Sequence, residues 1–381
     1  MRKILYTAAH VLEETEDGYD LGRSTSNNLS FAEVLNDALV AEIREQSAGY
    51  GATSGDDRLR VAIAGNVGLH SDHVLTTNGA IGALHLAIFC LCDQGDEVVT
   101  VTPGFPATFD LIQALGAVKK SLTLHFDDSY ALDIGRLIPL LNERTKLVVL
   151  ISPHNPSGVT TSPEVVAEVL HVMATHSPEA CLLMDETFRE ASYGVHPAMP
   201  SFAPLSERVL TVCSLSKAHG APGLRLGWIT CTAPGLLAHL TVGKGKTAIS
   251  SSVLDERLGT HILENATGIL GDRNARLGVA LGVTEDWISK NSELVEWVRP
   301  NAGGMCCVRL KASAYDEAAV EEFYRLAAER QINIATGDRF GDERRVFRLG
   351  FGALPIEKYE RALDALEDTC RRVLNGGSVA R

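Results

Sequence analysis

Short apolar runs alternate with stretches of helical spacing between residues 71 and 232. The apolar runs are rich in β-branched residues, are bounded by glycine, proline or charge, and read HVLTT, DEVVTV, TKLVVLIS, ACLLMDE, RVLTVCS and RLGWITC. Between them lie IGALHLAIFCLC, ATFDLIQALGA and SPEVVAEVLHVMATH, whose apolar residues recur at helical intervals. Strands that are apolar on both faces and separated by helices predict a mostly parallel sheet sandwiched by helices.

The last third of the chain has a different pattern. Residues 235–290 look helical and carry the chain out of the predicted sheet. Two strands, GMCCVRLK and RVFRLGFG, then alternate with two amphipathic helices, DEAAVEEFYRLAAERQ and PIEKYERALDALEDTCRRVLN. We therefore predict an α/β fold, with a large domain over residues 47–285 and a smaller α+β domain built from residues 1–46 and 286–381.

Composition narrows the classes of function. The 381 residues carry a formal net charge of −13 and show no basic stripe, which argues against nucleic-acid or anionic-membrane partners. The eight cysteines include no C-x-x-C pair, so we predict no metal site. The chain's opening turns acidic too soon for a signal peptide, and no run approaches eighteen apolar residues. We expect a cytoplasmic protein.

One segment carries the strongest chemical signal. SLSKAHGAPGLRLGW follows a predicted strand, which puts Lys217 beyond the carboxyl end of a parallel sheet, where such sheets bind ligands. Desolvation and a neighbouring cation would lower the pKa of this lysine and favour an imine with an aldehyde. Arg225 could clamp a phosphate with its planar guanidinium. The alternative is a glycine-rich loop with an ordinary exposed lysine.

Four further segments follow strands in the same region. TNGAIG, at residues 77–82, opens a helix whose N-terminus could bind an anion. Phe105 could lie against an aromatic ring, or be a core residue. Asn155, in HNPSG, could donate to a ring oxygen, or only form an Asn-Pro turn. Asp185 ends an apolar strand and could pair with a protonated pyridine nitrogen, or cap the next helix.

This set, in this order, resembles the fold type I pyridoxal-phosphate enzymes, and specifically the class I/II aminotransferases. The resemblance covers about residues 50–352 and rests on S-x-S-K-x-x-G-x-P-G-x-R-x-G, on YGATSGDDRLR and on HNPSG. It implies pyridoxal 5′-phosphate as cofactor and a covalent carbon–nitrogen double bond from Lys217, which then moves the substrate's α-proton. Asp185 would pair with the pyridine nitrogen, Asn155 with the ring hydroxyl oxygen, and Phe105 would stack on the ring. The phosphate would be held by Gly79, Ala80, Ile81, Ser214 and Arg225.

The resemblance also implies partners for the site. Tyr50 looks like the tyrosine that reaches the phosphate of a neighbouring subunit, which implies a homodimer with shared active sites. Arg348, together with Asn155, looks like the group that grips the substrate α-carboxylate. The small-molecule partners would then be an amino acid and a 2-oxo acid.

Two departures from the family pattern bear on the reaction. Phe188 stands where relatives usually carry a tyrosine that donates to the ring hydroxyl oxygen. Residues 21–28, LGRSTSNN, replace a common G-x-P-x-F segment and resemble the serine-rich segment of capreomycidine-synthase-like enzymes, which cyclise an arginine derivative. The sequence predicts an aminotransferase, with a lyase, decarboxylase, cyclase or oxidase on the same cofactor as the alternative. An effector-binding domain of a transcription regulator is disfavoured, because it would require a winged-helix module and a basic surface.

Overall fold

A seven-stranded sheet forms the centre of the large domain. The computed structural model describes residues 18–194 and 199–376. The opening segment, for which the sequence predicts no signal peptide, lies outside the described residues. The strand order is β2-β8-β7-β6-β5-β3-β4. All pairs are parallel except those of β8, which runs antiparallel to β2 and β7. The strands are β2 (Val74–Thr77), β3 (Glu97–Thr102), β4 (Val118–Thr123), β5 (Thr145–Ile151), β6 (Cys181–Asp185), β7 (Val209–Ser214) and β8 (Gly227–Cys231).

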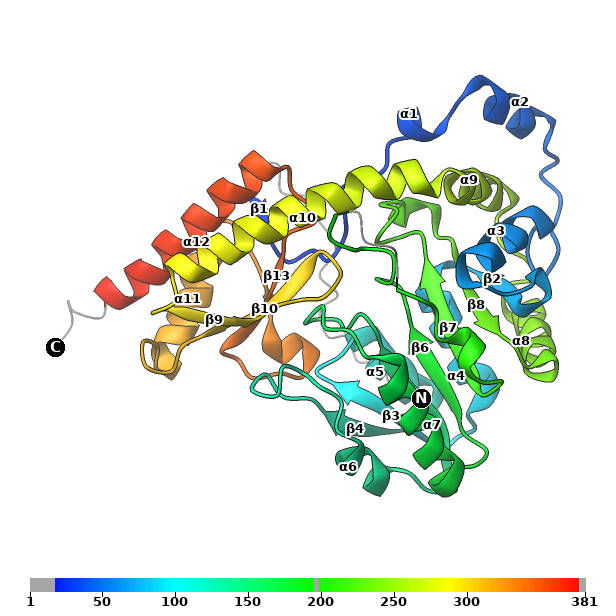
Figure 1. The fold of residues 1–381 in the computed structure, drawn as a ribbon, viewed down its shortest axis with the longest axis horizontal. Helices are drawn as coiled ribbons and strands as arrows, with labels where there is room; N and C mark the ends of the chain where they lie inside the picture. Colours follow the sequence, from blue (N-terminus) through cyan, green and yellow to red (C-terminus); the bar gives the residue numbers. More distant parts are fainter. Residues whose placement is uncertain (1–17, 195–198, 377–381) are drawn as a thin grey trace.

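Helices cover both faces of this sheet, as predicted (Figure 1). One face packs its apolar side chains against α4 (Gly79–Leu91), α5 (Pro106–Leu115) and α8 (Pro234–Thr247). The other face packs against α7 (Pro163–His176) and the short α6 (Ile134–Leu137). A sheet buried on both sides needs strands without a polar face, which explains the continuous apolar runs in the sequence.

The small domain is built around an antiparallel sheet of order β12-β13-β10-β9. Its strands are β9 (Val295–Val298), β10 (Met305–Leu310), β12 (Ala335–Thr336) and β13 (Val346–Gly350). Its apolar core includes α11 (Glu317–Glu329), α12 (Ile356–Gly376) and α10 (Ala266–Lys290), the long helix that crosses from α9 (Val253–Glu264) to the small sheet (Figure 1). The predicted α/β fold with a smaller α+β domain is confirmed. The domain boundaries stay a prediction.

The N-terminal stretch contacts both domains. β1 (Tyr19–Asp20) pairs in parallel with β11 (Ile332–Asn333), whereas α1 (Phe31–Val34) and α2 (Asp37–Glu45) contact α9. Between them runs an extended segment, residues 21–29, which we call the strap. Its first residue accepts from the Gly350 N–H at 2.7 Å, and its last donates to the Gly220 carbonyl at 2.6 Å. The strap therefore passes directly over the loop that carries Lys217.

No helix in residues 18–194 and 199–376 is both long enough and apolar enough to cross a membrane.

Candidate active site

The carboxyl ends of four parallel strands bring the predicted site residues to one edge of the sheet. Phe105 follows β3, Asn155 follows β5, Asp185 ends β6 and Lys217 follows β7. Because parallel strands all end at the same edge, sequence-distant side chains meet there. Arg348, from β13 of the small sheet, reaches the same place from the opposite side.

Lys217 contacts the strap at this edge of the sheet. Its half-buried side chain donates from Nζ to the Ser24 Oγ at 3.1 Å, and Nζ lies 5.6 Å from the centre of the Phe188 ring. Burial lowers the pKa of Lys217 to about 8, and the positive charge of Arg348 adds to this effect while Asp185 opposes it. A substantial fraction of the amine is therefore neutral near pH 8, as a nucleophile or base requires.

Asp185 is a buried carboxylate that faces the same space. Its Oδ1 accepts from the Thr187 N–H at 2.9 Å. Burial raises the pKa of Asp185, against the opposing effects of hydrogen bonds from Thr187 and of the charge on Lys217. A carboxylate in such a place is stabilised by a cation, and a protonated pyridine nitrogen is a cation of the right size. The residue therefore fits the ring-nitrogen partner that the sequence predicts.

The beginning of α4 and the loop after β7 form a cradle for an anion. Gly79 has a φ of +72°, and a Cβ on it would lie 2.5 Å from the Arg225 Nη2, so the close approach requires glycine. Arg225 is fixed by a hydrogen bond from its Nη1 to the Pro222 carbonyl at 2.8 Å. Backbone N–H groups at a helix start together with a guanidinium suit a phosphate. Ser214, at the end of β7, is buried nearby.

Ala80 and Ile81, two predicted members of the cradle, could contact an anion only through their backbone N–H groups. Ala80 follows Gly79 in the first turn of α4, where backbone N–H groups are free of helical partners. Ile81 is 45% exposed, so its side chain forms no wall of the site and only its backbone could bind an anion.

Arg348 and Asn155 form a clamp suited to a carboxylate. The Arg348 Nη1 donates to the Asn155 Oδ1 at 2.8 Å, and its Nη2 donates to the Gly22 carbonyl of the strap. Its Nε is buried and finds no hydrogen-bond partner among the described residues. Burial lowers the pKa of Arg348 to about 10, followed in size by the charge of Arg339. A desolvated guanidinium with donor capacity to spare favours an incoming carboxylate.

Two aromatic residues of the predicted set lie in contrasting places. Phe105 is half-buried and packs against the apolar clusters on both faces of the sheet, which suits either a ring-stacking or a core role. Tyr50 is 83% exposed and lines a surface cavity of about 740 Å³ beside residues 250–254. Its predicted contact with a neighbouring subunit stays a prediction.

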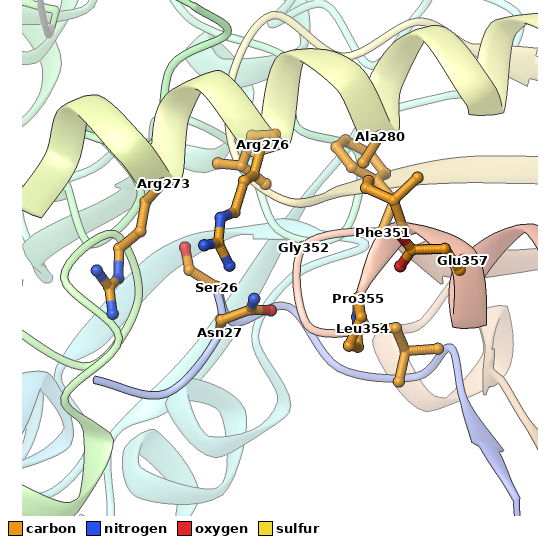
Figure 2. Close-up of a pocket in the computed structure, with 12 residues that line it drawn as sticks. Ser26, Asn27, Arg273, Arg276, Ala280, Phe351, Gly352, Leu354, Pro355 and Glu357 are labelled. Carbon is orange, nitrogen blue, oxygen red and sulfur yellow. The ribbon is translucent and has the colours of Figure 1, made fainter. Parts of the chain in front are cut away.

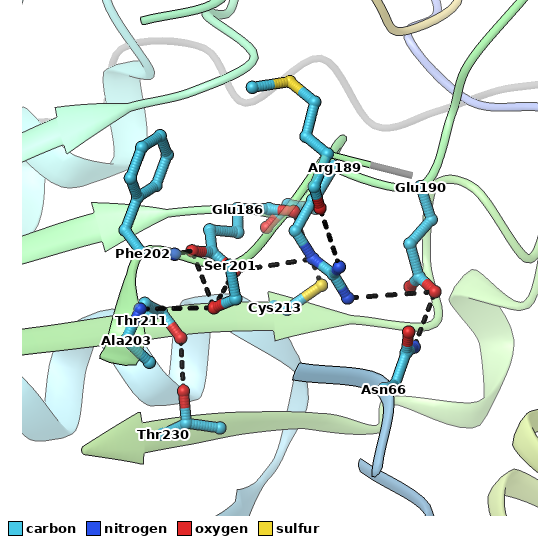
Figure 3. A network of polar contacts seen from close by, with 12 residues as sticks. Asn66, Glu186, Arg189, Glu190, Ser201, Phe202, Ala203, Thr211, Cys213 and Thr230 are labelled. Atoms are coloured by element: carbon cyan, nitrogen blue, oxygen red, sulfur yellow. Dashed lines mark hydrogen bonds and ion pairs between the residues drawn. The ribbon is translucent and has the colours of Figure 1, made fainter. Parts of the chain in front are cut away.

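The turn after β6 carries a buried ionic network that the sequence did not reveal (Figure 3). The Arg189 Nε lies 3.5 Å from the Glu186 Oε2, and its Nη2 lies 3.9 Å from the Glu190 Oε1. The Glu190 Oε2 lies 4.0 Å from the Nδ1 of His219, two residues beyond Lys217. Burial raises the pKa of Glu186 to about 7 despite the charge of Arg189. The network joins the turn after β6 to the loop that carries Lys217.

Removing the cation of this network is expected to destabilise the fold strongly. Arg189→Met would leave Glu186 and Glu190 buried without their shared partner, at a cost of about 3 kcal/mol in the free energy of unfolding. Urea unfolding followed by circular dichroism measures the loss. The matched control is Arg325→Met on α11, where an exposed arginine also pairs with two glutamates, Glu322 and Glu329, and where no measurable change is expected. Equal losses in the two variants would contradict this account.

Comparisons with known proteins agree with this geometry. The family model for aminotransferase class I and II matches residues 19–366. Capreomycidine synthase from Streptomyces vinaceus is 32% identical over 355 residues, covering 92% of this chain and 89% of that enzyme. A PLP-dependent aminotransferase from Streptococcus suis 89-1591 superposes with a TM-score of 0.85 at 24% identity, over 93% of this chain and 94% of the other. The PLP-dependent cyclase OrfR superposes with a TM-score of 0.81 at 26% identity, over 94% of each chain.

The fold, the family match and the chemistry of the site agree on the cofactor. A lysine with a lowered pKa, a buried carboxylate and an anion cradle at one sheet edge suit an aldehyde, a pyridine nitrogen and a phosphate respectively. The chain therefore belongs to the class I and II aminotransferase family, whose cofactor is pyridoxal 5′-phosphate.

Proposed function

We propose that the chain takes the α-proton from an L-amino acid with Lys217 and expels a substituent from the β-carbon, so that the substrate is cyclised or substituted there. The observation that carries this proposal is the hydrogen bond between the Lys217 Nζ and the Ser24 Oγ, at 3.1 Å. Elimination requires a second proton movement, to the leaving group, and a hydroxyl beside the base can provide its route. The similarity to capreomycidine synthase and to the cyclase OrfR supports the same choice.

The substrate would be oriented before any proton moves. Its carboxylate would bind Arg348, whose Nε is unpaired among the described residues, with Asn155 fixing the guanidinium plane. When bound, pyridoxal 5′-phosphate supplies an electron sink conjugated with the α-carbon, and its ring, phosphate and aldehyde carbon would be held by Asp185, the Gly79–Arg225 cradle and Lys217. The strap covers this edge of the sheet and would limit the access of water to the base.

Proton transfer would then follow the Lys217–Ser24 contact. The neutral amine accepts the α-proton, and the Ser24 hydroxyl passes a proton onward to the departing group at the β-carbon. A hydroxide so protonated leaves as water. An internal nucleophile of the substrate then adds to the same carbon and gives its own proton back through Ser24 to Lys217. The proton returns to the α-carbon from Lys217. Phe188, 5.6 Å from the amine, offers no hydroxyl that would compete with Ser24.

Amino-group transfer is the second candidate. It is favoured by the family match over residues 19–366 and by the Asn155–Arg348 clamp, which suits a 2-oxo acid as well as an amino acid. In that reaction Lys217 moves the proton from the α-carbon to the cofactor carbon without help. Ser24 would then have no proton to deliver.

Ser24→Ala separates the two candidates. Elimination from a β-hydroxy-L-amino acid, starting with L-threonine, is expected to slow by about 10²-fold because hydroxide must leave protonated. Elimination from β-chloro-L-alanine is expected to change by less than about threefold, because chloride leaves without a proton. Release of ammonia and 2-oxo acid measures both rates in holoenzyme without any added acceptor.

Thr25→Ala removes a neighbouring hydroxyl of the strap and serves as the control, with both rates expected to be unchanged. Two results would reject the proposal, and the first of them would favour amino-group transfer. One is stoichiometric conversion of the cofactor to its amine form with no β-elimination from any substrate. The other is equal slowing of the hydroxy and chloro substrates in Ser24→Ala.

A further inference from the structure

A second cavity lies on the side of the strap that faces α10. It has a volume of about 230 Å³ and is bounded by the strap, by α10 and by the turn that leads from β13 into α12 (Figure 2). Its apolar wall is contributed by α10, by the β13–α12 turn and by the first residue of α12, and it consists of Leu277, Ala280, Phe351, Leu354, Pro355 and Ile356. Its polar residues come from the strap, from α10 and from the first turn of α12. The cavity is thus amphipathic, with room for a small molecule.

Two arginines from α10 give one part of the cavity a positive charge. Arg273 and Arg276, one helical turn apart on α10, both line the cavity, and Arg276 extends toward Ser26 and Asn27 of the strap (Figure 2). Arg273 is 8% exposed, and its Nε has no hydrogen-bond partner among the described residues. Its Nη2 lies 3.6 Å from the Glu33 Oε1 and its Nη1 donates to the Ile269 carbonyl at 3.4 Å, so the Nε is the donor that stays without a partner among the described residues. Burial lowers the pKa of Arg273, and the charge of Arg276 adds to that effect.

Arg276 contacts the strap. With the Asn27 amide oriented to satisfy its neighbours, the Asn27 oxygen accepts from the Arg276 Nη1 at 3.2 Å and its nitrogen donates to the Gly352 and Ala353 carbonyls. No carboxylate among the described residues lies within ion-pair distance of the Arg276 guanidinium. Its charge is therefore open to an anion in the cavity.

One carboxylate lines the cavity, that of Glu357, and it lies away from the arginines. Glu357 is exposed in the first turn of α12, on the far side of the apolar wall from Arg273 (Figure 2). An acidic ligand would be attracted at the arginine end and repelled at this end. The arrangement suits a molecule with one anionic group and an uncharged apolar body.

The cavity is coupled to the loop of the reactive lysine. A Cβ on Gly220, three residues beyond Lys217, would lie 2.2 Å from the Asn27 carbonyl oxygen and 3.1 Å from the Arg273 Nε. The strap, α10 and the lysine loop therefore meet at one point. A ligand that joins the two arginines to the strap would fix the strap where Ser24 accepts from Lys217.

We propose that this cavity binds a small organic carboxylate with an aliphatic body, and that its occupancy holds the strap against Lys217. The carboxylate would lie between the Arg273 and Arg276 guanidinium groups and the Ser26 hydroxyl. The aliphatic body would cover Leu277, Ala280 and Phe351. The site is separate from the Arg348 clamp, which faces Lys217 from the small sheet.

Hexanoate titrated into holoenzyme, followed by calorimetry and by hydrogen exchange of residues 24–29, tests the proposal. We expect saturable binding, at least threefold slower exchange in the strap, and at least tenfold weaker binding to Arg276→Gln. Hexanamide, which has the same body without the charge, should bind at least tenfold more weakly than hexanoate. Glu357→Gln removes the opposing charge and should bind hexanoate at least as tightly as the native chain.

Three results would overturn the proposal. They are unchanged affinity in Arg276→Gln, equal affinity for the acid and the amide, and unchanged exchange of the strap at saturation. Leu354→Trp narrows the cavity while leaving both arginines in place, and it should also weaken binding at least tenfold. Because hexanoate could also bind the clamp, the titration is repeated in Arg348→Gln. Loss of all binding in that variant, with full binding in Arg276→Gln, would assign the ligand to the clamp alone and reject the second site.

Discussion

Lys217→Ala is expected to lower kcat/KM by about 10⁴-fold, the upper range for loss of a general base that also binds the cofactor covalently. The native side chain combines a pKa lowered to about 8 with a hydrogen bond to Ser24. Lys244 also reaches this edge of the sheet, where its Nζ donates to the Thr76 Oγ1 at 3.1 Å. Borohydride reduction of holoenzyme followed by peptide mapping should find the cofactor on residue 217 in the native chain and on no residue in the variant.

The control for this experiment is Lys119→Ala, which removes an exposed lysine of β4 and should leave activity unchanged. Far-UV circular dichroism should show that Lys217→Ala keeps its fold. Retention of a reducible covalent cofactor at another lysine, with activity within about tenfold of the native chain, would contradict the role given to Lys217.

Asp185→Asn is expected to lower activity without lowering thermal stability. The amide keeps an oxygen that can accept from the Thr187 N–H but loses the charge that would hold a pyridine nitrogen in its protonated form. We expect kcat to fall by about 10³-fold, the effect of removing one preorganised electrostatic contact in a buried site. Because burial raises the pKa of Asp185, its ionised form costs stability at neutral pH, and the neutral amide should leave Tm unchanged or raise it.

Asp185→Ala is the companion variant, since it also removes the acceptor for Thr187. It should show a similar loss of activity together with a loss of about 1 kcal/mol in the free energy of unfolding. Thermal unfolding and steady-state kinetics on the same preparations measure both quantities. Full activity in Asp185→Asn would show that this carboxylate does not tune the cofactor.

The large sheet was predictable because its strands are buried on both faces. That environment leaves a continuous apolar signal, as in LVVLI of β5 and CLLM of β6. β4, read from VKKSLT, was missed because it is an edge strand with mostly exposed or half-exposed side chains, and its lysines remove the apolar pattern. The other six strands of the large sheet were all predicted.

The site was predictable only where a residue's chemistry is local. Lys217 and Arg225 stand in one segment with a specific spacing, and Asp185 ends a strand, so each is marked by its immediate neighbours. Ser24 and the Arg189 network depend on contacts across long stretches of chain, such as the 193 residues between Ser24 and Lys217. No local pattern records such a contact. The serine-rich strap was the one available signal, and it does not indicate which serine meets the lysine.

The strap's two anchors have a mechanical consequence. One end is bonded to Gly350 of the small sheet and the other to Gly220 of the lysine loop, and Arg348 also donates to the strap at Gly22, two residues before Ser24. A displacement of Arg348 toward an arriving carboxylate would either break the hydrogen bond to Gly22 or move Gly22 with it. If Gly22 moves, Ser24 moves with it, and the hydrogen bond from the Lys217 amine changes. Binding of the substrate's carboxylate would then alter the surroundings of the amine before the bond to be broken is in place.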